Sequence, residues 1–251
     1  GKKKFSQEWL KDNTNINISH KNSYYGEYSF YYWIWKNILN NLNEDQWIGF
    51  TGYRYHWSQN NLIDSDKLNK LINKDNFSEY ILRKIPKEWE NSNVVLGEKI
   101  KVNNWKLSKI LRHAKKKFLL NPSNFFKSRQ NIKLHFDVFH GEGLLDKAIN
   151  VLDTSERSDF KYFVENENSF NRENLFFCRS KELMKKYFLS VFNWLEECEK
   201  IFGFDLEGYS KTRIYAFLAE RYLSFWFNKH SNPKTWPIFF FDTNINKIKI
   251  I

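Results

Sequence analysis

Aromatic residues are the feature of this sequence that most limits what it can fold into. Phe, Tyr and Trp make up 19% of the 251 residues, and hydrophobic residues of all kinds make up 41%. A chain with this much apolar surface has to bury most of it, which argues against disordered, collagen-like and coiled-coil structures. Its length fits one large globular domain, and we find no internal repeat or clear linker. We therefore predict a single domain over residues 1–251.

The charge balance indicates which classes of partner the chain can bind. Lys and Arg outnumber Asp and Glu by 40 to 29, a net charge of +11 that favours nucleic acids, phosphorylated small molecules or acidic membranes. Two cysteines are too few for a disulfide scaffold or a four-thiolate zinc site, and no apolar run reaches the length of a bilayer span. These features predict a cytoplasmic location, either free or peripheral at the inner face of the membrane.

Helical and strand patterns alternate along the chain and predict an α/β fold. A helix with aromatic residues on several faces is expected from Asn22 or Ser23 to about Leu39, and the short apolar strand 46–50 follows it. In such sheets, ligands bind beyond the carboxyl ends of the strands, and Arg54 lies at such a position. Further strands are expected at residues 94–97, 174–178 and 238–241, and further helices at about 105–118, 180–201 and 211–227.

Asp64 and Asp66 have the Asp-x-Asp spacing with which many sugar-nucleotide enzymes hold a divalent cation on a diphosphate. They follow only two apolar residues and precede a helical pattern. Capping a helix is the commoner role for acidic residues in this position. The sequence therefore favours the capping role and predicts no metal site.

Two other stretches concentrate polar side chains. Residues 135–143 place two His and two carboxylates beside a glycine turn, which suits acid–base chemistry but also an ordinary loop in which His140 packs locally. On the helix expected at 211–227, Arg213 and Glu220 share one face, whereas Arg221 falls on the apolar stripe. A structural ion pair and a carboxylate that faces a ligand both fit this second pattern.

Six segments, spread over nearly the whole chain, carry the motifs of one known family. They are residues 12–22 (DNTNINISHKN), 24–28 (YYGEY), 32–37 (YWIWKN), 47–55 (WIGFTGYRY), 173–180 (ENLFFCRS) and 213–221 (RIYAFLAER). Together they resemble the bacterial capsular-polysaccharide glycosyltransferase family filed as domain of unknown function 4422. Gly52 and Tyr55 stand where that family usually has His and a second Arg, and Asn15 stands where it has Gly. Of the family's cationic pair, Arg54 alone remains.

The resemblance implies a GT-A-like nucleotide-diphospho-sugar transferase fold, with a mixed sheet flanked by helices. The family's first strand would lie upstream of Gly1, so the chain is expected to be N-terminally truncated. The implied reaction transfers a sugar from a nucleotide-diphosphate donor, with a UDP-sugar favoured, to a growing surface polysaccharide of the capsule or O-antigen type. The acceptor would be a glycan or a lipid-linked glycan.

Site residues follow from the matching motifs. Because the strand that ends at Phe50 is followed by an arginine rather than an Asp pair, we expect a protein cation, and no bound metal, to meet the diphosphate. Glu220 would be the base that deprotonates the acceptor hydroxyl if the enzyme inverts, with Asp137 as its rival. The expected donor-binding residues are Asn22, Glu27, Lys36, Tyr53 and Arg54. The expected acceptor- or sugar-binding residues are His140, Asn174, Arg213 and Arg221.

Two other functions stay open at this point. A nucleic-acid-binding module would use the net positive charge and exposed aromatic rings, but most aromatic residues here fall on stripes typical of a core rather than between lysines. An inactive sugar-nucleotide-binding relative or scaffold fits the departures from the family motif. Separately, residues 105–118 combine an apolar stripe with a Lys-rich side, which is typical of a helix on an anionic membrane surface and also of a solvated helix over the core.

Overall fold

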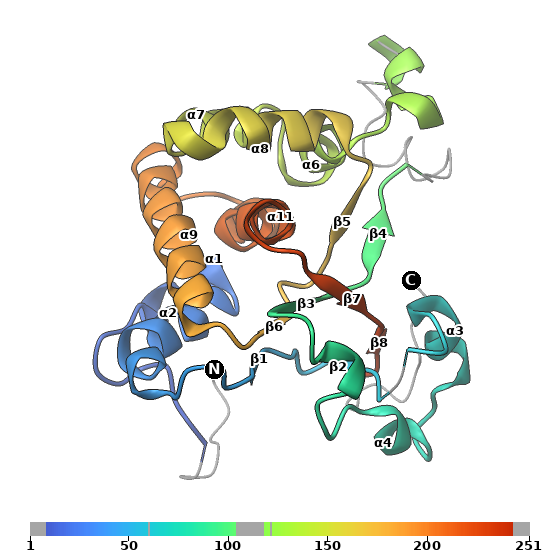
Figure 1. Ribbon diagram of the computed structural model, residues 1–251. Coiled ribbons are helices and arrows are strands. Elements are labelled where there is room, and N and C mark those ends of the chain that lie inside the picture. Colours follow the sequence, from blue (N-terminus) through green and yellow to red (C-terminus); the bar gives the residue numbers. More distant parts are fainter. Residues whose placement is uncertain (1–8, 60, 104–117, 121, 243–251) are drawn as a thin grey trace.

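The computed structural model describes residues 9–59, 61–103, 118–120 and 122–242 (Figure 1). The helices are α1 (Asn22–Tyr25), α2 (Tyr28–Asn37), α3 (Ser65–Leu71), α4 (Phe77–Tyr80), α6 (Ile132–His140), α7 (Leu144–Asn150), α8 (Thr154–Asn166), α9 (Lys181–Phe202), α10 (Tyr209–Thr212) and α11 (Ile214–His230). The strands are β1 (Ile48–Gly49), β2 (Tyr55–Trp57), β3 (Val94–Gly97), β4 (Lys99–Lys101), β5 (Ser169–Asn171), β6 (Phe176–Cys178), β7 (Lys234–Trp236) and β8 (Ile238–Phe240).

A mixed sheet forms the centre of the fold, as the sequence predicts. Its strand order is β1-β6-β3-β7; β6 runs antiparallel to both neighbours, and β3 runs parallel to β7. The pairs β2–β8 and β4–β5 form two antiparallel ribbons beside it. The four residues of β3 are all buried, which agrees with the continuous apolar run from which this strand is predicted.

The long helix α11 lies inside the molecule, surrounded in Figure 1 by α9, α7, α8 and β5. Its side chains are buried on nearly every side, a pattern typical of a helix in the middle of a core. The neighbouring helix α9 begins where Ser180 caps it by accepting a hydrogen bond from the Leu183 amide at 3.2 Å, and it ends at Gly203. The predicted positions of both helices are confirmed to within a few residues.

The N-terminal helix differs from the prediction because it is two short helices. The chain breaks at Gly26, which adopts φ +57° between α1 and α2. Neither predicted cap holds, because Lys21 occupies the N-cap position of α1 without a side-chain hydrogen bond. Asn22 instead donates its side-chain amide to the Gly26 carbonyl at 3.0 Å and to Ser29 Oγ at 2.7 Å, which fixes the bend.

Residues 135–140, expected in a loop, belong to α6. Asn131 caps this helix by accepting from the Leu134 amide at 2.8 Å, and Ile132, Phe136 and His140 then fall four residues apart on its buried face. The glycine turn begins only at Gly141. Most of the basic helix expected at 105–118 lies outside the described residues. In the described part of the chain, no helix is both long enough and apolar enough to cross a membrane.

Candidate functional site

A cavity of about 310 Å³ opens where the loop after β1, the start of α2, the turn between β5 and β6 and the N-terminal half of α11 meet. These elements are far apart in the sequence, and the sheet brings them together because β1 and β6 are neighbours in it. The residues that line the cavity are Glu27, Tyr31, Thr51, Gly52, Tyr53, Arg54, Tyr55, Glu173, Asn174, Leu175, Tyr209, Arg213, Ala216, Phe217 and Glu220.

One side of the cavity is formed by the contacts of Glu27. Its Oε1 accepts a hydrogen bond from the Asn174 amide at 2.6 Å, and its Oε2 lies 3.4 Å from Nη2 of Arg213. Burial raises the pKa of Glu27, while the Asn174 amide and the Arg213 guanidinium oppose that shift. Three of the predicted site residues are therefore joined in one polar cluster.

Glu220 forms a second polar cluster at the cavity. Its Oε1 accepts the backbone N–H of Glu173 at 2.6 Å, and its Oε2 pairs with the guanidinium of Arg221. Arg221 is only 2% exposed; its Nη1 donates to the Phe217 carbonyl at 3.2 Å, and its guanidinium lies 4.5 Å from the Phe170 ring centroid. Glu220 and Arg221 thus form a buried ion pair, and the Glu220 carboxylate also lines the cavity.

Glu173 and Asn174 hold an unusual backbone conformation. They are consecutive non-glycine residues with φ of 71° and 56°, in the left-handed region that side chains normally avoid. Such strain is typical of functional sites, where surrounding contacts hold it in place. Here Asn174 is held through Glu27, and Tyr31 donates its hydroxyl to the Asn174 carbonyl at 3.0 Å.

Glu173 is a second carboxyl group in the cavity, beside Glu27, whose pKa is raised. Burial, together with the negative charge of Glu220, raises the pKa of Glu173 to about 7. The Tyr55 hydroxyl donates to this carboxyl and partly offsets the rise. A carboxyl that titrates near neutral pH can take up and release a proton during a reaction.

Arg54 lines the cavity from the other rim. Its guanidinium carbon lies 4.7 Å from the Tyr53 ring centroid and 5.8 Å from that of Phe240, and its Nε is buried without a hydrogen-bond partner. Arg54 forms no ion pair with any residue that the structure describes. A half-buried guanidinium beside open space is suited to an anionic ligand, because its planar set of donors matches phosphate oxygens.

Gly26 is required by the packing of Arg213. A Cβ atom added to Gly26 would lie 2.3 Å from Nη2 of Arg213, at a φ of +57° that side chains rarely adopt. We expect Gly26→Ala to destabilise the fold by roughly 1–3 kcal/mol, as measured by chemical denaturation. Gly52→Ala is the matched control, since its Cβ would meet only atoms at 3.7 Å or more and its φ is ordinary. Equal stability of the two variants would contradict the assigned role of Gly26.

Several residues predicted for the site lie elsewhere. Asn22 braces the α1–α2 bend, and Lys36 rests its ammonium 3.5 Å from the Trp35 ring centroid, away from the residues that line the cavity. His140 is buried behind the cavity, with Nε2 3.2 Å from Arg221 Nη2, and burial lowers its pKa to about 2. Asp137 accepts the Gly143 amide at 3.0 Å and so fixes the turn after α6.

The acidic pair on α3 has the capping role that the sequence favours. Asp64 is the N-cap of α3 and accepts from the Lys67 amide at 2.8 Å, while Asp66 lies in the first turn. Glu98 also contributes to the start of α3, because its carboxylate accepts a hydrogen bond from the Ser65 backbone N–H at 2.9 Å. In the described part of the chain, no group of three or more His, Cys, Asp or Glu side chains is arranged to hold a metal ion.

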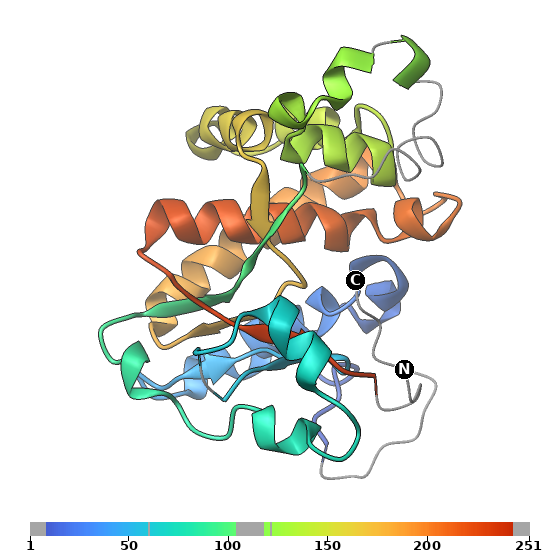
Figure 2. The ribbon, with the colours of Figure 1, turned by 90° about the vertical axis from the view of Figure 1, so that its right-hand side faces the viewer.

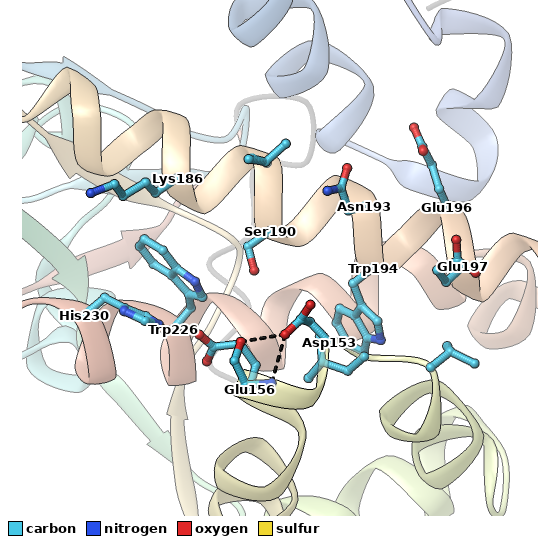
Figure 3. Close-up of a pocket in the computed structure, with 14 residues that line it drawn as sticks. Asp153, Glu156, Lys186, Ser190, Asn193, Trp194, Glu196, Glu197, Trp226 and His230 are labelled. Carbon is cyan, nitrogen blue, oxygen red and sulfur yellow. Dashed lines mark hydrogen bonds and ion pairs between the residues drawn. The ribbon is translucent and has the colours of Figure 1, made fainter.

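A larger cavity, of about 620 Å³, lies at the opposite end of α11 (Figure 3). The carboxylates at this cavity are Asp153, Glu156, Glu196 and Glu197. Glu156 is already paired, at 2.8 Å with His230 and at 3.2 Å with Lys229. Both cavities have carboxylates, but the basic side chains of the larger one, Lys186 and His230, lie beside Glu182 and Glu156. The smaller cavity holds Arg54, which has no ion pair among the described residues, and is therefore the better candidate site for an anionic ligand.

Sequence reasoning missed Glu173 and Tyr55 as site residues. Glu173 stands beside Asn174 in a segment that does match the family, and that adjacency is the one sequence signal that points to it. Its left-handed backbone, by contrast, leaves no trace in the sequence, because glycine is the residue normally expected there.

Comparisons with known proteins agree with this architecture. The family described as domain of unknown function (DUF4422) matches residues 1–231. The apo structure of the bifunctional glycosyltransferase WbbM is similar to this chain with a TM-score of 0.63 and 19% sequence identity, over 91% of this chain and 38% of that one. The chain thus spans well under half of that protein, and the likeness shows a shared fold. No curated protein matches the sequence. From the family match, this chain belongs to the DUF4422 family.

Proposed function

We propose that this chain is a GT-A-like glycosyltransferase, and that the cavity of about 310 Å³ is its active site. The observation that carries the proposal is Arg54, an arginine without an ionic partner among the described residues, which lines the same cavity as the carboxyl groups of Glu27, Glu173 and Glu220. The fold shared with a glycosyltransferase supports the same class. The substrates would be a nucleotide sugar, with a UDP-sugar favoured, and a growing capsule- or O-antigen-type glycan, free or lipid-linked.

Arg54 is proposed to bind the diphosphate of the donor. Two parallel N–H···O hydrogen bonds would hold the phosphate oxygens, and the guanidinium charge would stabilise the negative charge that develops on the leaving diphosphate. Tyr53, whose ring lies beside Arg54 and is 71% exposed, is placed to contact the rest of the nucleotide. This assignment uses no metal, and we propose metal-independent transfer, to be tested by turnover in EDTA and with added Mg²⁺ or Mn²⁺.

Among the carboxyl groups, Glu173 is the better placed base for an inverting transfer. The acceptor hydroxyl oxygen would bond to the anomeric carbon while the bond from that carbon to the diphosphate breaks, and Glu173 would take the hydroxyl proton. Both oxygens of Glu220, the base expected from the sequence, already have partners, so we assign it the positioning of the Glu173 backbone. Glu27, Asn174 and Arg213 would bind sugar hydroxyls.

The proposal is tested first by donor binding. Thermal shifts and calorimetry with UDP-, GDP- and CMP-sugars should identify at least one donor, because a bound ligand raises apparent stability by mass action. Turnover is then measured with glycan acceptors by release of the nucleotide, which is UDP or GDP from a diphosphate donor and CMP from a CMP-sugar. Binding without turnover on any acceptor would favour the inactive relative instead, and absence of binding to every donor would contradict the proposal.

Arg54→Lys should weaken donor binding by roughly 10- to 100-fold, since a point charge replaces a two-pronged donor at a cost of about 1.5–3 kcal/mol. The fold should be unaffected, because Arg54 has no ion pair within the described structure. Arg83→Lys is the matched control: Arg83 is exposed and only donates to the Ser78 carbonyl at 3.0 Å. Unchanged donor affinity in Arg54→Lys would remove Arg54 from the donor site.

A further inference from the structure

The net charge of the chain is confined to one stretch of sequence. Residues 99–136 contain eleven Lys and Arg and no Asp or Glu, and the remaining 29 basic residues are matched by 29 acidic ones. The charge of +11 therefore arises entirely between β4 and the middle of α6. A stretch of sequence with one sign of charge favours anionic partners, and five of its cations belong to the described residues: Lys99, Lys101, Lys127, Arg129 and Lys133.

Exposed apolar side chains lie within the same stretch. Leu119 is 67% exposed, Leu120 77% and Phe126 63%. We call residues 118–120 and 122–129 the basic tip; in both Figure 1 and Figure 2 it projects from the body of the molecule beyond the end of β4. Large apolar side chains gathered on a projection are typical of an interaction surface.

The basic tip is anchored to the fold by a small core of its own. Phe125 is only 5% exposed and packs with Phe118, Leu134 and Val138, so the tip rests on the outer side of α6. Gln130 fixes the same point by donating its side-chain amide to the Phe125 carbonyl at 2.6 Å. The inward rings hold the segment in place, and the outward apolar side chains remain in solvent.

Exposed cations lie in the basic tip and on β4. Lys127 and Arg129 follow Phe126 closely and are exposed, and the side chains of Lys99 and Lys101 are exposed on β4. Among the described residues, Arg129 makes one side-chain hydrogen bond, to Ser123 Oγ at 3.2 Å, so most of its donors remain available for other partners.

We propose that the basic tip is a docking surface for an anionic lipid membrane. Leu119, Leu120 and Phe126 would enter the boundary between headgroups and acyl chains, and the surrounding Lys and Arg would pair with lipid phosphates. The aliphatic pair favours a membrane over a nucleic acid, because leucines enter an acyl layer but offer no face on which a base stacks. This proposal does not rest on the transferase activity.

The test is sedimentation of the full chain with vesicles of phosphatidylcholine alone or of phosphatidylcholine and phosphatidylglycerol at 3:1. Binding is expected only to the anionic vesicles and should weaken with salt. Lys127→Glu/Arg129→Glu should weaken binding to the anionic vesicles by roughly 30-fold or more, because each cation lost lowers the affinity by a factor of about five to six. Leu119→Ser/Leu120→Ser/Phe126→Ser should weaken it without removing the salt dependence.

Matched controls test whether the loss of vesicle binding is specific to the basic tip or follows from any loss of positive charge or of an exposed apolar side chain. Lys84→Glu/Lys87→Glu changes two exposed lysines elsewhere, and Leu189→Ser changes an exposed leucine on α9; both should bind like the unmodified chain. Circular dichroism checks that every variant is folded. The proposal is overturned if the unmodified chain ignores anionic vesicles, if both tip variants bind as well as the controls do, or if the tip binds RNA but not vesicles.

Discussion

Glu173→Gln is expected to lower turnover by roughly 10²- to 10⁴-fold while donor affinity stays within about threefold, because the amide keeps the shape of the side chain but cannot accept the hydroxyl proton. In the unmodified protein, burial and the charge of Glu220 raise the pKa of Glu173 to about 7. The rate should therefore fall about tenfold per pH unit below pH 7. The pH–rate profile of the variant should lack that acid limb.

The same variant should be more stable than the unmodified protein at alkaline pH. A carboxyl whose pKa is higher in the folded state contributes stability below its unfolded pKa, near 4.5, and this contribution is lost as the pH rises through about 7. The ionised carboxylate therefore destabilises the fold above neutrality, and the amide removes that effect. The melting temperature of Glu173→Gln should exceed that of the unmodified protein at pH 8 and match it at pH 4.5.

The control for both measurements is Glu167→Gln. Glu167 is exposed and lies between α8 and β5, six residues from Glu173, so its replacement should change neither the rate nor the pH dependence of melting. If Glu173→Gln turns over normally, Glu173 is not the base. In that case Glu220→Gln becomes the decisive variant. Glu220 also lines the cavity, where its carboxylate accepts the backbone N–H of Glu173.

Arg221→Met is expected to destabilise the protein by about 3–5 kcal/mol, which corresponds to a fall of roughly 6–20 °C in melting temperature. Arg221 is 2% exposed and pairs with Glu220, and the methionine would leave that carboxylate without its cation. Denaturant titration measures the free energy of unfolding. Replacing both partners, as in Glu220→Gln/Arg221→Met, should restore part of the loss because no unpaired charge remains.

Lys229→Met is the control for Arg221→Met. Lys229 pairs with Glu156 and Asp159, but its side chain is 30% exposed, so water screens the pair and its loss should cost less than about 1 kcal/mol. If the Arg221 and Lys229 variants lose equal stability, burial does not make the Glu220–Arg221 pair more important to stability than an exposed pair.

The elements that could be predicted from the sequence are those with a clear hydrophobic pattern or a clear capping residue. The helix α9 has apolar residues three and four apart between Ser180 and Gly203, and β3 is a continuous apolar run. The break at Gly26 was hidden because aromatic residues continue on both sides of it, and α6 was hidden because its His and Asp resemble loop residues. In both cases tertiary packing overrode the local signal.

The candidate site was predictable where helical geometry alone sets the relation between residues. Arg213, the N-cap residue of α11, and Glu220 are seven residues apart and so lie on the same side of the helix, and both line the cavity. The position of Glu173 beside Glu220 depends on positive φ angles at Glu173 and Asn174, and neither residue type predicts such a turn. Lys36 was expected at the site from a family motif and Asp137 from the polar stretch 135–143, and the structure places both in local packing, outside the residues that line the cavity.

If the cavity is the donor site, as we propose, the burial of α11 also determines where a new donor preference can arise. Glu220 and the supporting Arg221 stand on a helix packed on nearly every side, so each change there disturbs the core as well as the cavity. Tyr53 and Tyr209 line the same cavity from its rim and are 71% and 69% exposed. Substitutions at these two tyrosines can reshape the entrance at little cost in stability. Relatives with different sugars should therefore diverge at the rim first, and engineering of donor choice should begin there.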